Sequence, residues 1–360
     1  MLKRRVGVVR RILTEGCTRQ AQEIIVEIDG KEERALNYPH LTGCVSPGDS
    51  VLANTTACAL SLGTGGLHFV MANLSNPEGE DAAAPGHIMK LRYTPNQLAV
   101  LSVEEQESPN HKNMAGFVSL DGMPVVCCEL HSQIAGVAAG VKQAHPSAHV
   151  SYIMTDEAAL PLALSNLAAA LRIKGLIDST ITCGQAFGGE IEAVNLFSAL
   201  AAAKDVLHAD IAIICQGPGN TGTGTPLGFS GIAQGTAANT AGSIGGRPVI
   251  IPRISFADKR ERHRGISHHT LTVLEMVLLV PSFVPVPRLS DDCARIIRTQ
   301  LEALECRVQH KFVPDIDGRP GLNELERQGV RVQTMGRSVQ EDREFFLSAS
   351  AGGVLAAELI

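Results

Sequence analysis

The chain has 360 residues, of which 44% are hydrophobic and 19% charged, and its formal net charge is −6. This length suffices for two domains, and the composition is that of a compact globular protein rather than a disordered one. Aromatic residues make up 4% and tryptophan is absent. Nucleic acid is therefore not expected as a partner, because the sequence offers neither a net positive charge nor many stacking side chains.

Cysteine placement and the N-terminal segment indicate the compartment. The nine cysteines show no even spacing, and several lie within apolar runs, where buried reduced thiols are usual: Cys127, Cys128, Cys183 and Cys215. The basic N-terminus is not followed by the apolar stretch of a secretory signal, and no segment approaches the ~20 apolar residues of a membrane span. We expect a cytoplasmic protein without a membrane partner, and a homo-oligomer is compatible with the sequence.

Residues 1–80 show the period of two that is typical of β-strands. Val6 and Val8 alternate with other residues, and the same pattern recurs around residues 24–28, 51–53 and 69–71. Turns are expected at Asp29-Gly30 and at residues 47–49. The pattern predicts a small all-β domain, either a barrel or a sandwich. Residues 76–85 are polar and bounded by prolines, as in a linker, and residues 81–122 are expected to connect this domain to the next.

From residue 123 to residue 360, apolar runs alternate with stretches of helical periodicity. This alternation predicts a larger Rossmann-like α/β domain, in which helices cover both faces of a mainly parallel sheet. The expected strands are residues 125–130, 150–155, 180–183, 211–215 and 249–254; the expected helices are residues 134–144, 158–174, 191–207 and 229–244. Helices at 291–304 and 339–351 and a strand at 330–334 would extend the sheet layer or form a cap.

A glycine-rich loop follows the expected strand at 211–215. Residues 216–231 read Gln-Gly-Pro-Gly-Asn-Thr-Gly-Thr-Gly-Thr-Pro-Leu-Gly-Phe-Ser-Gly. Glycines let backbone N–H groups turn toward a ligand, so this loop is predicted to bind an anion or a carbonyl oxygen. It is not a dinucleotide fingerprint, because Thr225-Pro226 interrupts the helix start and no acidic residue follows before Asp258. The predicted ligand-binding residues are Gly217, Gly219, Asn220, Gly222 and Gly224. The alternative is a flexible connection.

Polar side chains follow each expected strand of the sheet. Parallel strands direct their carboxyl ends to one edge, where ligands bind in α/β proteins. On this ground His131 and Asp156 are predicted to be catalytic, and Gln185, Gln216 and Arg253 to bind ligand. The simpler alternative for Asp156, taken alone, is that it caps the following helix.

Residues 252–270 combine five Lys or Arg residues with three histidines. In an acidic chain this segment is a local positive patch, suited to phosphate or carboxylate groups. Arg262, His263 and Arg264 are therefore predicted to bind an anionic substrate. Ser267 is expected to cap a helix with His268 and His269 in its first turn, where the helix dipole favours a neutral imidazole that can act in catalysis. The alternative is a solvated basic loop.

Metal and covalent chemistry receive less support from the sequence. Glu129 and His131 would point to the same side of a strand and, with Asp156 and one of the paired histidines, could form a zinc or manganese site. No H-E-x-x-H motif is present, so we assign no metal ligand and identify no cofactor. His131 and Ser132 would face opposite sides of a strand, which excludes a base–nucleophile pair there while the strand persists.

Six irregular segments occur in an order that resembles an uncharacterised bacterial family, domain of unknown function 3866. They are Lys-Leu-Arg-Tyr-Thr-Pro (90–95), Glu-Glu-Gln-Glu-Ser-Pro (104–109), Glu-Leu-His-Ser (129–132), Gly-Gln-Ala-Phe-Gly-Gly (184–189), residues 216–225 of the glycine loop, and His-Arg-Gly-Ile-Ser-His-His-Thr-Leu-Thr (263–272). The resemblance implies no activity, cofactor or catalytic residue. The functional expectation therefore rests on the residues.

Two functions fit these residues. The first is an enzyme, a hydrolase or group transferase that acts on a small anionic, phosphorylated or carboxylate-bearing metabolite. The second is a metabolite-binding or regulatory protein that uses the same cleft without catalysis. An enzyme needs a titratable group beside the ligand, and the three histidines of the basic segment favour the enzyme.

Overall fold

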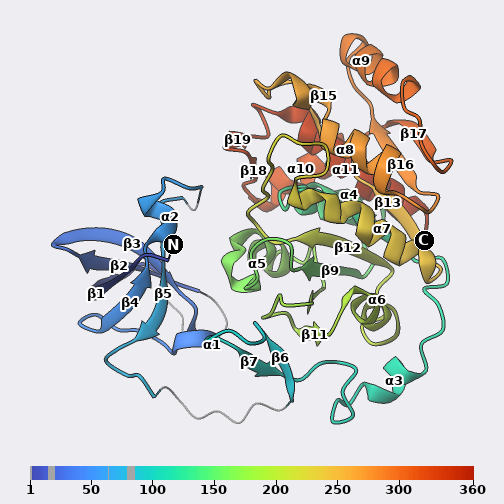
Figure 1. The fold of residues 1–360 in the computed structure, drawn as a ribbon. Helices are drawn as coiled ribbons and strands as arrows, with labels where there is room; N and C mark the ends of the chain where they lie inside the picture. The colour runs from blue at the N-terminus through green and yellow to red at the C-terminus, as the bar shows by residue number, and fades with distance from the viewer. Residues whose placement is uncertain (1, 15–20, 64, 79–85) are drawn as a thin grey trace. The chain divides into compact units, whose positions relative to one another are not determined.

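The computed structural model describes residues 2–14, 21–63, 65–78 and 86–360 (Figure 1). The chain forms two compact units, Met1–Val100 and Leu101–Ile360, each of which is described by itself. Much of the linker expected at residues 76–85 lies outside the described residues. Within the described parts, no helix combines the length and the apolar character needed to cross a bilayer.

The N-terminal unit contains a closed five-stranded barrel, which confirms the predicted β domain and selects the barrel over the sandwich. The strand order is β1-β2-β3-β5-β4, and β1 closes the barrel because it pairs with both β2 and β4. The elements of this unit are β1 (Arg4–Ile12), β2 (Gln22–Ile28), β3 (Lys31–Asn37), α1 (Pro39–Thr42), β4 (Ser50–Asn54), α2 (Thr56–Ala59), β5 (His68–Asn73), β6 (Ile88–Lys90) and β7 (Leu98–Val100).

The inward face of β1 differs from the sequence expectation. Val6 is 56% exposed, whereas Val9 lies in the barrel core. Gly7 is the residue that faces inward beside them, and an added Cβ there would lie 2.6 Å from the Val26 side chain. The inward-facing residues of β1 are therefore Gly7 and Val9, and not Val6 and Val8 as the alternation suggested. The Asp29-Gly30 turn is present as predicted, with φ values of 50° and 75°.

The second unit is built on an eight-stranded, all-parallel sheet, which confirms the predicted α/β fold. The strand order is β11-β10-β9-β12-β8-β13-β16-β17. These strands are β8 (Pro124–Cys127), β9 (Val150–Thr155), β10 (Ser179–Cys183), β11 (Ile191–Ala193), β12 (Ile211–Gln216), β13 (Arg247–Ile250), β16 (Phe283–Pro287) and β17 (Lys311–Ile316).

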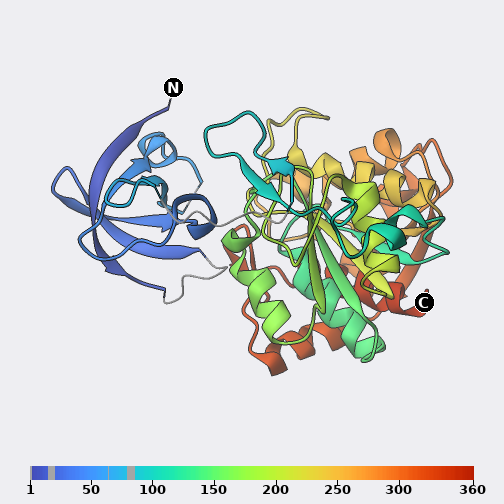
Figure 2. The same cartoon turned by 90° about the horizontal axis from the view of Figure 1, so that it is seen from below.

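Helices cover both faces of this sheet (Figures 1 and 2). One face packs against α4 (Gln133–Ala144), α5 (Asn166–Ile173), α10 (Arg319–Gln328) and α11 (Arg343–Glu358). The other packs against α6 (Leu196–Asp205) and α7 (Ala233–Ser243). The remaining elements of the unit include α3 (His111–Ala115), α9 (Asp291–Glu302) and the short strands β18 (Gln333–Thr334) and β19 (Arg337–Ser338). Four cysteines are buried and form no disulfide bond, as expected: Cys127, Cys128, Cys183 and Cys215.

Several elements differ from the predicted ones. The strand expected at 125–130 ends at Cys127, so Glu129 and His131 lie beyond it and the strand-face argument for them is wrong. The helix expected at 191–207 begins at Leu196, because residues 191–193 form β11 at the sheet edge. Strands β16 and β17 and helix α10 were not predicted.

The direction of the chain reverses between β8 and β12. From β8 the chain passes through α4 to β9, on one side of β8 in the sheet, whereas from β12 it passes through α7 to β13, on the other side. The two connections use opposite faces of the sheet. Loops that leave neighbouring strands in opposite directions open a crevice at the carboxyl edge, which is where α/β proteins bind ligands.

Candidate functional site

Glu129 is the centre of a buried polar network at this crevice. It follows β8, is 1% exposed, and its Oε1 lies 2.7 Å from Nδ1 of His269 and 3.1 Å from Nη1 of Arg253. Burial opposes ionisation of Glu129, but the hydrogen bond from His269 and the charge of Arg253 outweigh it, so its pKa lies below the ordinary value. Glu129 is therefore an anion that aligns one imidazole.

Arg253 connects Glu129 to a second carboxylate. Its Nη2 lies 3.6 Å from Oδ2 of Asp258. The Arg260 guanidinium donates to the same carboxylate, from Nε to Oδ1 at 2.9 Å and from Nη2 to Oδ2 at 2.8 Å. The bonds from Arg260 hold the pKa of Asp258 well below its usual range. The Arg253 guanidinium thus lies between the carboxylates of Glu129 and Asp258 and links them within the buried network.

A small hairpin brings the basic segment to the strand edge. Strands β14 (Ile254–Ser255) and β15 (Gly265–Ile266) pair in antiparallel fashion, and the N–H of Ser267 donates to the carbonyl of Arg253 at 2.8 Å. Helix α8 (His268–Thr272) starts directly after this hairpin, and Ser267 caps it as predicted by accepting from the N–H of His269. The hairpin therefore brings the three histidines to the strand edge, where His269 contacts Glu129.

The three histidines lie in contact with one another. The ring centroids of His263 and His268 are 5.0 Å apart, those of His263 and His269 5.1 Å, and those of His268 and His269 4.3 Å. Burial, reinforced by the charge of Arg253, lowers the pKa of His263 to about 3. Burial together with the neighbouring His269 also lowers the pKa of His268. The imidazoles of His263 and His268 are therefore neutral at pH 7.

The glycine loop is closed at its base by side-chain hydrogen bonds. Oδ1 of Asn220 accepts from Gln216, Ser230 and the N–H of Gly231 at 3.1, 2.7 and 3.0 Å. The Gln216 amide also donates to the carbonyl of Glu129 at 3.1 Å. Asn220 and Gln216, both predicted to bind ligand, are thus largely engaged in holding the loop against the network.

The predicted glycines have different roles in the structure. Gly219 and Gly224 have φ values of 111° and 78°, as a turning loop requires. At Gly217 an added Cβ would lie 2.5 Å from the carbonyl oxygen of Ala159, which indicates close packing. At Gly222 it would lie 3.7 Å from Cε1 and Nε2 of His269, so this glycine places the loop beside that imidazole.

Phe229, which the sequence analysis did not single out, completes the surroundings of His269. Its ring stacks on the imidazole with centroids 3.9 Å apart and planes 2° apart. The ring is thus fixed by stacking on its face and by Glu129 at Nδ1. A stacked aromatic side chain within a glycine-rich loop carries no sequence signal of its own.

Several buried polar atoms near Glu129 have no hydrogen-bond partner among the described residues. They include Glu129 Oε2, Gln216 Oε1 and Gln234 Oε1. The same three residues line a cavity of about 10 Å³, roughly the room that one water molecule needs. A polar cavity with unpaired acceptors is suited to a water molecule or to a donor group of a ligand.

His131 and Asp156, both predicted to be catalytic, have structural partners. His131 Nε2 lies 2.6 Å from Oγ of Ser165, and its Nδ1 lies 3.2 Å from the Tyr152 hydroxyl. Burial lowers the pKa of His131 to about 4. Asp156 accepts from the N–H of Gln185 at 2.7 Å, closing the turn after β10. The structure does not bring these residues into the histidine cluster.

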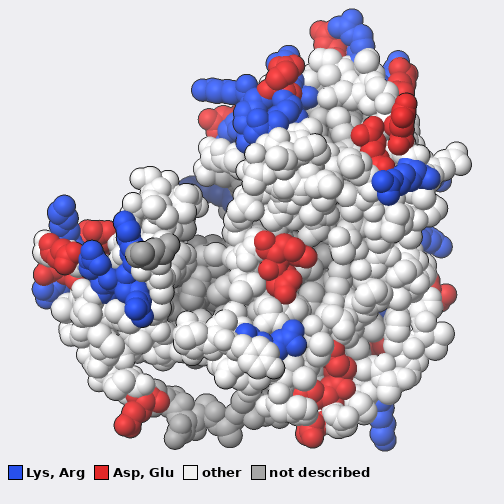
Figure 3. Space-filling model, in the orientation of Figure 1, with Lys and Arg blue, Asp and Glu red and all other residues white. Residues whose placement is uncertain are grey.

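Arg262 and Arg264 are exposed at the outer end of the same segment. Figure 3 shows Lys and Arg side chains gathered at the end of the α/β unit that carries β15 in Figure 1. Lys259 is also exposed there, and the charge of Arg262 contributes to the lowered pKa of His268. The positive patch predicted from the sequence therefore lies beside the histidines.

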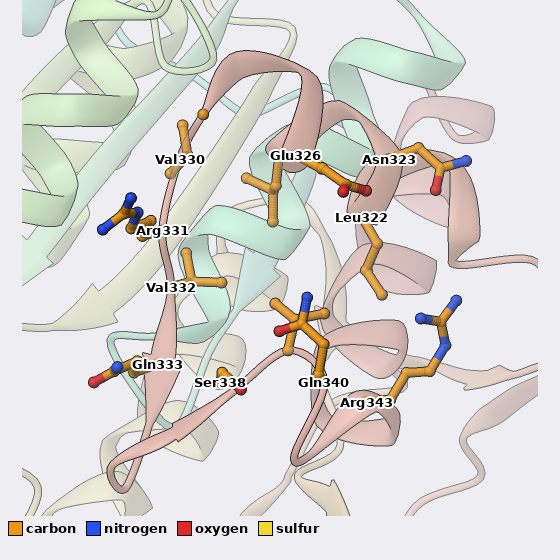
Figure 4. A pocket seen from close by; sticks show the side chains of 13 residues that line it. Leu322, Asn323, Glu326, Val330, Arg331, Val332, Gln333, Ser338, Gln340 and Arg343 are labelled. Atoms are coloured by element: carbon orange, nitrogen blue, oxygen red, sulfur yellow. The ribbon is translucent and has the colours of Figure 1, made fainter.

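Another cavity lies away from this network. It has a volume of about 540 Å³ and lies between α10, the segment after it, and the start of α11. Figure 4 shows Leu322 and Val332 facing its interior, whereas Arg331 points away from it. No histidine or cysteine lines this cavity. Its ionisable lining residues are Glu326, Arg331 and Arg343.

The fold and the strand-edge network define an α/β protein with a charged, histidine-rich site. The chain belongs to a family described as proteins of unknown function, DUF3866, whose model matches residues 34–353. No curated protein and no solved structure matches the chain.

Proposed function

We propose that this protein is an enzyme, a hydrolase or group transferase, that acts on a small anionic metabolite at the carboxyl edge of the parallel sheet. The observation that carries the proposal is the Glu129–His269 pair. Glu129 accepts from Nδ1 of His269, which leaves Nε2 with the lone pair that accepts a proton. A buried carboxylate that orients a histidine is the arrangement that acid–base catalysis uses.

The expected substrate is anionic because of the charges around this imidazole. Arg262 and Arg264 are exposed on either side of His263 in the chain, and the charge of Arg262 acts on His268, while the buried Arg253 is neutralised by Glu129 and Asp258. The exposed guanidiniums are therefore the groups free to attract phosphate or carboxylate. The glycine loop adjoins the imidazole at Gly222 and leaves space on that side.

The proposal is tested with a library of phosphorylated and carboxylate-bearing metabolites. Compounds that raise the melting temperature are incubated with the protein, and products are measured by mass spectrometry. We expect at least one compound to be converted, and His269→Ala to retain binding while losing at least about 100-fold in turnover. His145→Ala, at an exposed histidine outside the site, is the matched control.

Two outcomes would contradict the proposed enzymatic function. Stabilising compounds that are never converted would favour the alternative, a metabolite-binding or regulatory protein. Equal turnover in the wild type and in His269→Ala would remove the proton-transfer role from this imidazole.

A further inference from the structure

We propose that His263, His268 and His269 bind one divalent transition-metal ion, most favourably zinc. One ring nitrogen from each histidine lies within 4.8 Å of the other two. Three imidazoles with an open fourth position form the ligand set of many catalytic zinc sites. This metal site deepens the proposed function and rests on the same imidazole, but its occupancy is measured independently of turnover.

The hydrogen bonds of the cluster leave one nitrogen of each ring for the ion. Nδ1 of His263 lies 2.8 Å from Oγ of Ser267, and Nδ1 of His269 lies 2.7 Å from Glu129. Both rings therefore have Nε2 for coordination. Histidine ligands of metals commonly bond their second nitrogen to a carboxylate or another polar group in this way, because the bond fixes the ring and strengthens the ligand.

His268 provides an independent observation. Its Nε2 is buried and has no hydrogen-bond partner among the described residues. A buried polar atom without a partner is costly unless a ligand satisfies it. The ring touches both other histidines, so an ion shared by the three satisfies this nitrogen.

The geometry requires a small contraction. Zinc–nitrogen bonds of 2.0–2.1 Å at tetrahedral angles place the nitrogens roughly 3.4 Å apart. Since the nitrogens lie within 4.8 Å of one another, the rings approach by up to roughly 1.4 Å when the ion binds. His263 lies in the loop between β14 and β15, where side-chain and loop adjustment can supply this movement.

The ligand set selects the kind of metal. Imidazole nitrogen favours zinc, copper, nickel and cobalt, whereas magnesium and calcium prefer oxygen ligands. Glu129 lies behind His269 and orients it rather than binding the ion. The set considered from the sequence was Glu129, His131, Asp156 and one of the paired histidines, but His131 and Asp156 are engaged elsewhere. With zinc bound, Nε2 of His269 would be a ligand and could not accept a proton. A water molecule in the open position would then supply the base that the proposed function assigns to this imidazole.

The test uses the full chain after treatment with a chelator. Equilibrium dialysis against zinc chloride, followed by elemental mass spectrometry, is expected to give about one zinc per chain, and dialysis against magnesium chloride none. Cobalt chloride should produce the visible absorption of a tetrahedral cobalt centre. His268→Ala and His263→Ala should each weaken zinc binding at least about 100-fold, and Glu129→Gln about 10- to 100-fold.

His145→Ala is the control for the loss of an exposed histidine and should bind zinc as the wild type does. The melting curve of each variant, measured without metal, separates loss of ligand from loss of fold. Zinc uptake well below one equivalent in the wild type, or unchanged uptake in both His263→Ala and His268→Ala, would overturn the metal site. Zinc binding without conversion of any metabolite would instead contradict the proposed enzyme and leave the metal site standing.

Discussion

Oε1 of Glu129 lies 2.7 Å from Nδ1 of His269, although 140 positions separate the two residues in the chain. The contact joins the end of β8 to the start of α8, so it depends on the whole order of the central strands. Both side chains are almost completely buried, and Arg253 supplies the compensating positive charge. Because this cluster is buried, removing one charged member leaves the opposite charge of its partners buried without compensation.

Glu129→Ala is expected to lower the free energy of unfolding by about 3 kcal/mol, because it leaves Arg253 and His269 buried without their shared acceptor. Urea denaturation at pH 7 measures the change. Asp292→Ala is the matched control, since it removes one partner of the exposed Arg295–Asp292 pair and should change stability by less than about 0.5 kcal/mol. Equal losses in both variants would contradict a special role for the buried network.

Gly231→Ala is expected to destabilise the protein by about 2 kcal/mol through overpacking. Its Cβ would lie 2.5 Å from Cγ of Glu129, so the methyl group displaces the carboxylate that orients His269. Turnover should therefore decrease together with stability. Thermal denaturation and product formation are measured on the same preparation.

Gly222→Ala in the same loop provides the comparison for Gly231→Ala. Its Cβ would meet the His269 ring at an ordinary contact distance of 3.7 Å, and stability should change by less than about 0.5 kcal/mol. The added methyl group narrows the space beside Nε2, so ligand-induced stabilisation should fall while the fold remains. A large loss of intrinsic stability in Gly222→Ala would show that the loop is tightly packed there.

The sequence was sufficient to predict the architecture where local patterns carry it. The barrel strands follow from alternation and from the Asp29-Gly30 turn, and β9, β10 and β12 follow from short apolar runs. Strand β16 was missed because Pro285 and Pro287 lie within it, and proline normally indicates the absence of a strand. Strand β11 was missed because its three residues lead almost directly into α6.

The site could be predicted only in part. Residues that follow the strands could be named from the sequence, but their pairing depends on the position of β8 between β12 and β13. The hairpin of β14 and β15 has two residues in each strand, too few for a periodic signal. Without that hairpin, nothing in the sequence indicates that His263 returns to His268 and His269, or that Asn220 closes the glycine loop.

The pH dependence of stability should report on His131. Its pKa is about 4 in the folded protein and near 6.5 in the unfolded chain, so the unfolded state binds the proton more readily. The contribution of His131 to the free energy of unfolding is fully present above pH 6.5. It decreases as the pH falls toward 4, and the loss is about 2 kcal/mol at pH 5. Chemical denaturation between pH 7 and pH 5 measures this slope.

His131→Gln should flatten this slope, because glutamine takes up no proton in this range. His145→Ala is the control, since an exposed histidine has little effect on the pH dependence. The measurements are made with a chelator present, so that metal binding does not contribute. An unchanged slope in His131→Gln would assign the acid sensitivity to other buried histidines, such as His263.

Inorganic phosphate should stabilise the protein in a salt-dependent manner, because the exposed guanidiniums of Arg262 and Arg264 attract an anion to the histidine cluster. At low ionic strength, a phosphate concentration about tenfold above the dissociation constant adds about 1.4 kcal/mol of stability. Raising sodium chloride to about 0.5 M shortens the screening length to a few ångströms and should remove most of this gain. The double variant Arg262→Ala, Arg264→Ala should lose it at low salt as well. Arg298→Ala, at an exposed position on α9, should respond to phosphate as the wild type does, and equal responses in all three proteins would place the anion elsewhere.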